Sequence, residues 1–204
     1  GALPAQIDKA IYNFGMAMGP FTMFDLAGMD VSYLVRQERR KAGQLPDDPL
    51  YYLMVDKLAQ LGRFGQKTGA GFYKYEKGNR SPIANPEVEK LIREEAEKHA
   101  VPQKTFTDEE IVARCIYPMI NEGAFILEEG IALRPSDIDT VWVNGYGFPA
   151  YRGGPMFYGD TIGLAEVVSK IRSYQAEYGQ MHWGLSPLLI KLAEEGKTFA
   201  EWNK

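Results

Sequence analysis

Apolar residues recur at helical spacing through the first part of the chain, and a proline or an aspartate stands where each predicted helix begins. Pro4 and Pro20 suit a first helical turn, where a missing backbone N–H costs nothing. Asp30 and the pair Asp48-Pro49 mark the other starts, because an oxygen ahead of the first turn accepts a free N–H. The apolar faces comprise Ile7, Ala10, Ile11 and Phe14; Phe21, Phe24 and Leu26; Val31, Leu34 and Val35; and Leu50, Leu53, Met54, Leu58 and Leu61.

The second part of the chain continues the helical pattern after an interruption. Residues 65–75, "GQKTGAGFYKY", combine glycines with alternating aromatics, which predicts a turn or a short extended piece. Asn85-Pro86 and Ser186-Pro187 each begin a further predicted helix. Thr107 and Glu110 form a capping box ahead of a long apolar helix. No convincing set of strands is present, so the predicted fold class is all-α.

The sequence contains an internal repeat, which is the strongest clue to its organisation. Residues 19–31, "GPFTMFDLAGMDV", align with residues 154–167, "GPMFYGDTIGLAEV". Upstream, Ile7-Asp8 matches Ile138-Asp139. The aligned pairs are Gly19-Pro20 with Gly154-Pro155, Asp25 with Asp160, and Gly28 with Gly163. A long helix precedes Gly130 in the second copy, whereas Gly1 opens the first, so we expect the chain to begin inside a repeat and to be a fragment of something longer.

The second copy carries extra residues ahead of its Gly-Pro pair, in a segment that we call the corner: residues 145–160, "GYGFPAYRGGPMFYGD". Its matching segment in the first copy, "FGMAMGPF", predicts a helix end, a glycine turn and a proline-led helix start. Glycine lets two helices approach closely, and the aromatics can fill the space between them. A packed corner and a ligand contact are both compatible with this pattern.

Composition narrows the classes of partner. The 204 residues are 45% hydrophobic and 25% charged, and the net charge is −4. A protein that binds nucleic acid or an anionic membrane needs a basic face, and a negative net charge does not favour one. No apolar run approaches the roughly 20 residues of a membrane span, so we expect neither nucleic acid as a partner nor membrane insertion. Cys115 is the single cysteine, which excludes an internal disulfide and fits a reducing compartment.

Candidate chemistry is sparse. Lys67-Thr68 precedes its glycines instead of opening a helix, so a phosphate loop is not indicated, and no dinucleotide fingerprint follows a strand. His99 and His182 lie far apart without cysteine partners, so no metal site is predicted. Cys115 shares an apolar face and is expected in the core. We therefore assign no catalytic, cofactor-binding or metal-binding residue to this chain, and these features alone indicate a helical packing or interaction module.

Three motifs extend this interpretation. "GMAMGPFTMFDLAGMDV", "GRFGQKTGAGFYKY" and the long segment from "PMINEGAF" to "GGPMFY" resemble the C-terminal part of the 3-hydroxyacyl-CoA dehydrogenase family. The tandem arrangement resembles the multifunctional fatty-acid β-oxidation enzymes, which add enoyl-CoA hydratase activity on an upstream domain. The resemblance covers nearly the whole chain. It implies two tandem helical repeats related as a pseudo-dimer, each like the C-terminal helical domain of 6-phosphogluconate dehydrogenase.

The resemblance also implies a division of labour. In the family, an upstream Rossmann domain binds NAD, and the catalytic His–Glu pair and an Asn lie upstream of the matching region. In the second copy the family's Asn-Arg is replaced by Ala113-Arg114. Only the first copy's turn is placed to face the acyl-CoA substrate, so the substrate-cleft candidates are Met16, Met18, Gly19, Pro20 and Phe21. The fragment alone is expected to be inactive; the alternative is a non-catalytic all-α interaction or dimerisation module.

The predicted organisation has three parts. Residues 1–81 form the first repeat, residues 82–106 a linker with one helix, and residues 107–204 the second repeat. We expect the repeats to pair about a pseudo-two-fold axis, which would bury Val31, Leu34 and Val35 and the helix of residues 50–61. The chain ends in Asn-Lys and not in the peroxisomal Ser-Lys-Leu address, so we expect a bacterial cytoplasm, with the peroxisome as the alternative.

Overall fold

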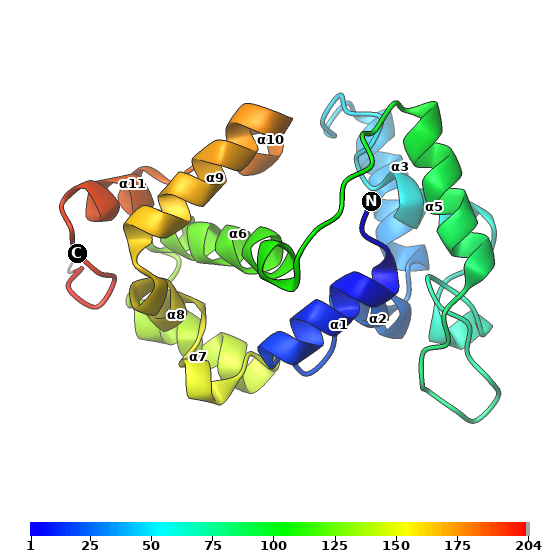
Figure 1. Cartoon of the computed structure of the whole chain (residues 1–204), viewed down its shortest axis with the longest axis horizontal. Coiled ribbons are helices and arrows are strands. Elements are labelled where there is room, and N and C mark those ends of the chain that lie inside the picture. The colour runs from blue at the N-terminus through cyan, green and yellow to red at the C-terminus, as the bar shows by residue number, and fades with distance from the viewer. Residues whose placement is uncertain (203–204) are drawn as a thin grey trace. The chain divides into compact units, whose positions relative to one another are not determined.

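A computed structural model describes residues 1–202, and its elements are helices joined by turns (Figure 1). The α-helices are α1 (Pro4–Phe14), α2 (Pro20–Ala27), α3 (Asp30–Lys41), α4 (Leu53–Gln60), α5 (Pro86–Lys98), α6 (Asp108–Glu128), α7 (Pro135–Gly145), α8 (Pro155–Ile162), α9 (Leu164–Tyr178), α10 (Gln180–Trp183) and α11 (Pro187–Glu194). Two short 3-10 helices are η1 (Gln66–Thr68) and η2 (Ala150–Arg152). Residues 1–202 contain only isolated β-bridges and no longer strand, so the all-α prediction is confirmed.

None of the described helices is both long and apolar enough to cross a membrane. The two final residues, from which the sequence-based expectation about the compartment was drawn, lie outside the described part of the chain.

The chain divides into two compact units, and helix α1 belongs to both. The first unit contains Gly1–Lys9 and Met18–Phe106; the second contains Ala10–Ala17 and the chain from Thr107 onward. The boundary therefore falls inside α1, between Lys9 and Ala10. Helix α5 lies in the first unit, within the range predicted as a linker, and the three-part division stays a prediction.

Helix α6 is the centre of the second unit, and α7, α8, α9 and α11 pack on it (Figure 1). Its start is the predicted capping box: Glu110 N–H donates to Thr107 Oγ1 at 3.2 Å, and Thr107 N–H donates to Glu110 Oε2 at 2.9 Å. A Cβ on Gly123 would lie 2.3 Å from Met156 Sδ, so glycine is what permits this close approach of α6 to α8. Fully buried side chains of this core are Ile116, Ile120, Leu127, Met156, Ile171, Leu189 and Phe199.

The first unit has a smaller apolar core and a buried ion pair. Its core side chains are Met29, Val55, Leu58, Phe72, Tyr73 and Val88. Between α3 and α4, the Arg36 guanidinium lies 2.7 Å from Asp56 Oδ1, and both side chains are 8% exposed. Arg40 contacts the other carboxylate oxygen at 3.1 Å. Because both charges have partners, burying them avoids the large penalty of an isolated charge.

The start of α4 differs from the sequence-based prediction. Helix α4 begins at Leu53 and not at Pro49, although Asp48 Oδ1 accepts the Leu50 N–H at 2.8 Å as an N-cap would. Tyr52 then adopts a left-handed conformation with φ of 55°, which keeps it out of the helix.

The predicted apolar face of α3 does not point into the core of the first unit, whereas its burial against the second repeat stays a prediction. Val31, Leu34 and Val35 are 66%, 62% and 47% exposed. The periodicity found the amphipathic helix but assigned the wrong face to the interior. The buried positions are Met29, at the start of α3, and Arg36, whose charge is paired inside the unit. In α4 the buried face is Val55, Leu58 and Ala59, whereas Leu50 and Leu61 are 44% and 63% exposed.

Candidate functional site

Four of the five substrate-cleft candidates lie in the first unit, in the turn before α2 and in the first two residues of that helix. Gly19 is buried, and a Cβ there would lie 2.3 Å from Asp8 Cα. Pro20 opens α2, and Phe21 N–H donates to Asp8 Oδ1 at 2.9 Å. The Phe21 ring meets the buried Phe72 ring edge-on, with centroids 4.6 Å apart. Gly19 and Phe21 are thus held against Asp8 and Phe72, with Pro20 between them.

Asp8 holds this turn through a dense hydrogen-bond network. Beyond Phe21 N–H, its carboxylate accepts Thr22 N–H at 2.8 Å and Thr22 Oγ1–H at 2.7 Å. The Tyr73 hydroxyl donates to it at 2.8 Å. Burial, together with the bond to Asp8, raises the pKa of Tyr73 far above its usual range. Because Asp8 is 8% exposed and already satisfied, its role in this unit is structural, not that of an acid or base for a substrate.

Asp25 performs the same function one helix further on. Its carboxylate accepts the N–H groups of Phe72 and Tyr73, each at 2.9 Å, and the Tyr75 hydroxyl at 3.0 Å. Burial raises the pKa of Asp25, and these hydrogen bonds offset part of that effect. A Cβ on Gly71 would lie 2.0 Å from Asp25 Oδ1. The "KTGAGFYKY" segment is therefore a loop folded around a buried carboxylate, as its glycine pattern indicated, and not a phosphate loop.

Met16, the fifth cleft candidate, lies in the second unit. Its half-buried side chain packs against the core formed around α6. The five candidates are thus divided between the units, and their shared contact with a substrate stays a prediction.

The corner is packed. Phe148 is 2% exposed, and its ring meets the ring of Phe14 at 5.7 Å in an edge-on arrangement. Asp139 accepts the N–H groups of Met156 and Phe157 at 2.7 and 3.2 Å, which anchors the start of α8. These contacts favour the packed interpretation of the corner over a ligand contact.

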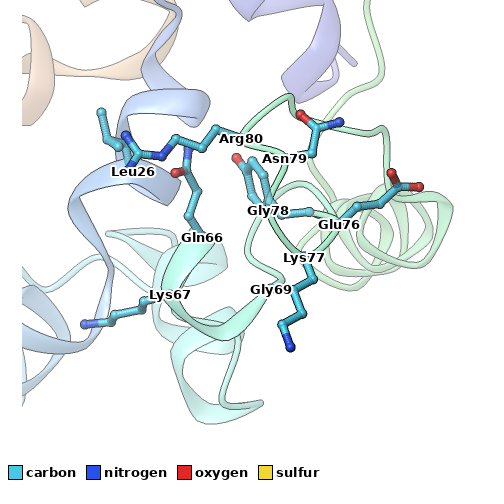
Figure 2. Close-up of a pocket in the computed structure, with 10 residues that line it drawn as sticks. Leu26, Gln66, Lys67, Gly69, Glu76, Lys77, Gly78, Asn79 and Arg80 are labelled. Carbon is cyan, nitrogen blue, oxygen red and sulfur yellow. The ribbon is translucent and has the colours of Figure 1, made fainter.

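The first unit also has a surface pocket of about 800 Å³ beside the "KTGAGFYKY" loop (Figure 2). Three cations, Lys67, Lys77 and Arg80, are among its lining residues. Lys67 forms an ion pair with Asp30. Figure 2 shows the Lys67 and Lys77 side chains extending in different directions, away from the Arg80 guanidinium. An anion site needs donors that converge on one point, so this pocket does not form one.

Other titratable residues do not assemble into a site. Among the described residues, no group of three or more His, Cys, Asp or Glu side chains could hold a metal ion. His99 Nε2 lies 3.6 Å from Glu95, whose other oxygen is paired with Lys57 at 2.9 Å. The hydrogen bond from Lys57 lowers the pKa of Glu95. Cys115 is half-buried at the edge of the second unit's core, close to the sequence-based expectation.

The position at which the resemblance placed a lost Asn is also structural. Ala113 is 7% exposed in α6. The Arg114 guanidinium stacks over Tyr174 and Tyr178, at 4.4 and 4.9 Å from the ring centroids. It also donates to the Tyr178 hydroxyl at 3.2 Å. Arg114 thus takes part in an aromatic cluster of the second unit.

Sequence reasoning aligned the two carboxylate pairs of the repeat but did not predict that they are buried or what they bind. Asp160 accepts Phe199 and Ala200 N–H at 2.7 and 3.0 Å, as Asp25 accepts Phe72 and Tyr73. The signal was present in the alignment, since Asp8 matches Asp139 and Asp25 matches Asp160. Acidic residues on helices are usually solvated, so their repetition at matching places was the only hint of burial.

The described helices form a domain in which the carboxylates of Asp8 and Asp139 hold the starts of α2 and α8 in place. A family model described as 3-hydroxyacyl-CoA dehydrogenase, C-terminal domain, matches residues 1–75 and 111–201. The chain belongs to this family.

The relatives are longer than this chain. It is 42% identical over 216 residues to the peroxisomal bifunctional enzyme of Danio rerio, covering 100% of this chain and 30% of that protein. It is 36% identical over 201 residues to the fatty acid oxidation complex subunit alpha of Vibrio campbellii, covering 95% and 26%. The dehydrogenase part of multifunctional enzyme 1 from C. elegans matches with a TM-score of 0.71 and 32% identity, over 95% of this chain and 42% of that one.

Proposed function

We propose that this chain is the C-terminal helical part of an NAD-dependent 3-hydroxyacyl-CoA dehydrogenase of fatty-acid β-oxidation, within a multifunctional enzyme that also carries enoyl-CoA hydratase activity. The reaction would be oxidation of 3-hydroxyacyl-CoA to 3-ketoacyl-CoA. The observation that carries the proposal is the family match over residues 1–75 and 111–201. The relatives, a peroxisomal bifunctional enzyme and a fatty acid oxidation complex subunit, support its multifunctional part.

The chain's own contribution would be one wall of the substrate cleft. The turn of Met18 to Phe21 is apolar, and Asp8 and Phe72 fix it, which suits contact with an acyl chain. Each methylene buried there would contribute about 0.8 kcal/mol. The turn carries no acid or base, so proton and hydride transfer would depend on residues of another domain.

NAD would be held outside the described part of this chain. Dinucleotide sites of the Rossmann type form at the carboxyl ends of parallel strands, and residues 1–202 have only isolated bridges. We therefore assign no residue here to the cofactor and place it on an upstream Rossmann domain. The relatives include peroxisomal enzymes and bacterial subunits, so both compartments named from the sequence stay predictions.

A domain exchange tests this proposal. The matching segment of the C. elegans dehydrogenase part is replaced by this chain, and NADH formation from a 3-hydroxyacyl-CoA is followed. We expect activity from the chimera and none from this chain alone, which should also leave NADH fluorescence unchanged in a titration. The unaltered C. elegans protein is the control. A folded chimera that binds NADH but does not oxidise the substrate would overturn the proposal.

The pairing of the two repeats about an approximate two-fold axis is part of the same proposal. It is supported by the matched carboxylates, Asp8 with Asp139 and Asp25 with Asp160, which hold equivalent elements in both copies. A crystal structure in which no such axis relates residues 19–31 to residues 154–167 would refute it.

The second candidate is a non-catalytic interaction module. The exposed apolar stripe of α3, Val31, Leu34 and Val35, favours it, because such a stripe is typical of a contact surface. The two candidate functions predict different activities for the chimera of the domain-exchange experiment. An interaction module would give a chimera that folds and assembles but lacks dehydrogenase activity.

A further inference from the structure

The corner differs from its counterpart in the first repeat by an insertion. Gly19 follows Asp8 by 11 positions, whereas Gly154 follows Asp139 by 15 positions. The longer segment contains Tyr151 and Arg152, and "FGMAMGPF" has neither a tyrosine nor an arginine. Both side chains turn towards the end of helix α1, and all the contacts described below lie within the second unit.

Tyr151 and Arg152 share one acceptor, the carbonyl oxygen of Phe14. The Tyr151 hydroxyl and Arg152 Nε–H each donate to it at 2.9 Å. Phe14 is the last residue of α1, and carbonyls in a last helical turn have no partner within the helix. A cation at this end of a helix also interacts favourably with its dipole. The two side chains therefore cap α1.

Aromatic packing also holds the Phe14 side chain at the end of α1. The Arg152 guanidinium lies 4.2 Å from the Phe14 ring centroid. The Phe14 ring meets Tyr158 edge-on at 5.1 Å. Such a stack fixes the plane of the guanidinium and aims Nε at the carbonyl. The Phe14 side chain and its backbone are thus held together.

The backbone beyond α1 is held as well. Ala17 N–H donates to the Gly147 carbonyl at 3.2 Å. Gly15 has a φ of +114°, and a Cβ there would lie 2.6 Å from the Tyr151 hydroxyl. Gly15 to Ala17 therefore follow a path that the corner determines. This path includes Met16 and leads directly into the proposed cleft turn.

We propose that Tyr151 and Arg152 are positioning residues for the substrate wall, and that the second repeat, which has no catalytic group of its own, acts on the reaction through this cap. The proposal rests on the proposed function. It predicts that disturbing the corner weakens acyl-CoA binding and leaves NAD binding unchanged.

The first test uses amide hydrogen exchange on the 204-residue chain. The variants are Tyr151→Phe, Arg152→Gln and their combination. Arg172→Gln is the control, because Arg172 lies in the same unit and pairs with Glu194 at 3.7 Å on the surface. We expect exchange of the Gly15, Met16 and Ala17 amides to accelerate at least about tenfold in the double variant, since hydrogen bonds with a charged donor are lost. Unchanged exchange at these three amides would overturn the proposal.

The second test uses the chimera. The double variant should raise KM for the 3-hydroxyacyl-CoA several-fold and leave KM for NAD unchanged, and Arg172→Gln should change neither. Arg152→Lys keeps the charge but not the planar stack, so it should restore binding only in part. Faster exchange with an unchanged acyl-CoA KM would refute the positioning role. An inactive chimera with an unaltered corner would instead refute the proposed function. Amide hydrogen exchange of the 204-residue chain would still decide whether the corner caps α1.

Discussion

The two repeats anchor their helix starts with the same carboxylates but surround them differently. In the first repeat, Asp8 accepts two backbone N–H groups and the hydroxyls of Thr22 and Tyr73. In the second, Asp139 accepts the two backbone N–H groups of Met156 and Phe157. Burial raises the pKa of Asp139 to about 6. The backbone frame is thus common to both repeats, whereas the hydroxyl donors are particular to the repeat that carries the proposed cleft turn.

The largest expected effect comes from the glycines that face these carboxylates. A Cβ on Gly19 would lie 2.3 Å from Asp8 Cα, and one on Gly154 would lie 2.3 Å from Asp139 Oδ1. Gly154 also has a φ of +112°. Gly19→Ala should therefore cost about 2–3 kcal/mol through overpacking, and Gly154→Ala about 1–2 kcal/mol more through backbone strain.

Urea unfolding followed by circular dichroism measures both variants. Tryptophan fluorescence adds a reading of the second unit alone, because Trp142, Trp183 and Trp202 all lie there. Gly145→Ala is the control, since nothing lies within 4 Å of its added Cβ, and it should be neutral or slightly stabilising. Equal losses for Gly19→Ala and Gly145→Ala would contradict the steric argument.

Amide substitution of the paired carboxylates should have a smaller and unequal effect. Asp8→Asn replaces an acceptor of four donors with a group that has one acceptor oxygen, so at pH 7 it should cost about 1–2 kcal/mol. Asp139→Asn removes a half-buried charge with two N–H partners and should cost about 1 kcal/mol or less. Urea midpoints of the two variants give the comparison, and a reversed order would show that the hydroxyl donors do not stabilise Asp8.

The pH dependence of the second unit sharpens the same contrast. The folded pKa of Asp139 is raised to about 6 from 3.8, so its proton is held more tightly in the folded state. Its contribution to stability is fully present below about pH 3.8 and is lost as the pH rises through about 6. The free energy of unfolding of the wild type, relative to Asp139→Asn, should therefore fall between these values. Tryptophan fluorescence follows it, and a flat difference would contradict the raised pKa.

The smallest effect is expected from a single hydroxyl. Tyr73→Phe removes the 2.8 Å bond to Asp8 and leaves the buried ring in place. The cost should be about 0.5 kcal/mol. In a double-mutant cycle with Asp8→Asn, most of that cost should disappear, because the hydroxyl then lacks its charged acceptor. Fully additive losses would indicate that the two groups do not interact.

Local signals in the sequence predicted much of the fold. The Thr107 capping box and the prolines at helix starts act on adjacent backbone, so a reader of the sequence can see both partners at once. The start of α4 could not be predicted in the same way, because the left-handed conformation of Tyr52 separates Asp48 from the helix. Nothing in the pattern of apolar residues distinguishes these alternatives.

The site was less predictable because its interactions join distant residues. Asp8 and Tyr73 are separated by 65 positions, and Phe14 and Arg152 by 138. Periodicity identifies the amphipathic face of α3 but not which face is covered, and a paired Arg36 displaced the expected apolar contact. The repeat supplied a long-range constraint, and it aligned the aspartates, but no role was derived from their match.

Helix α1 places a limit on how this protein can be divided. Its second half supplies Ile11 and Phe14 to the core of the second unit, although the sequence repeat would assign them to the first. A gene fragment that encodes residues 107–204 alone would therefore lack two core side chains, and duplication or recombination at the repeat boundary would separate them from their neighbours. The repeated sequence unit and the folding unit therefore do not coincide. A second repeat that is moved into another protein needs the second half of α1 as well.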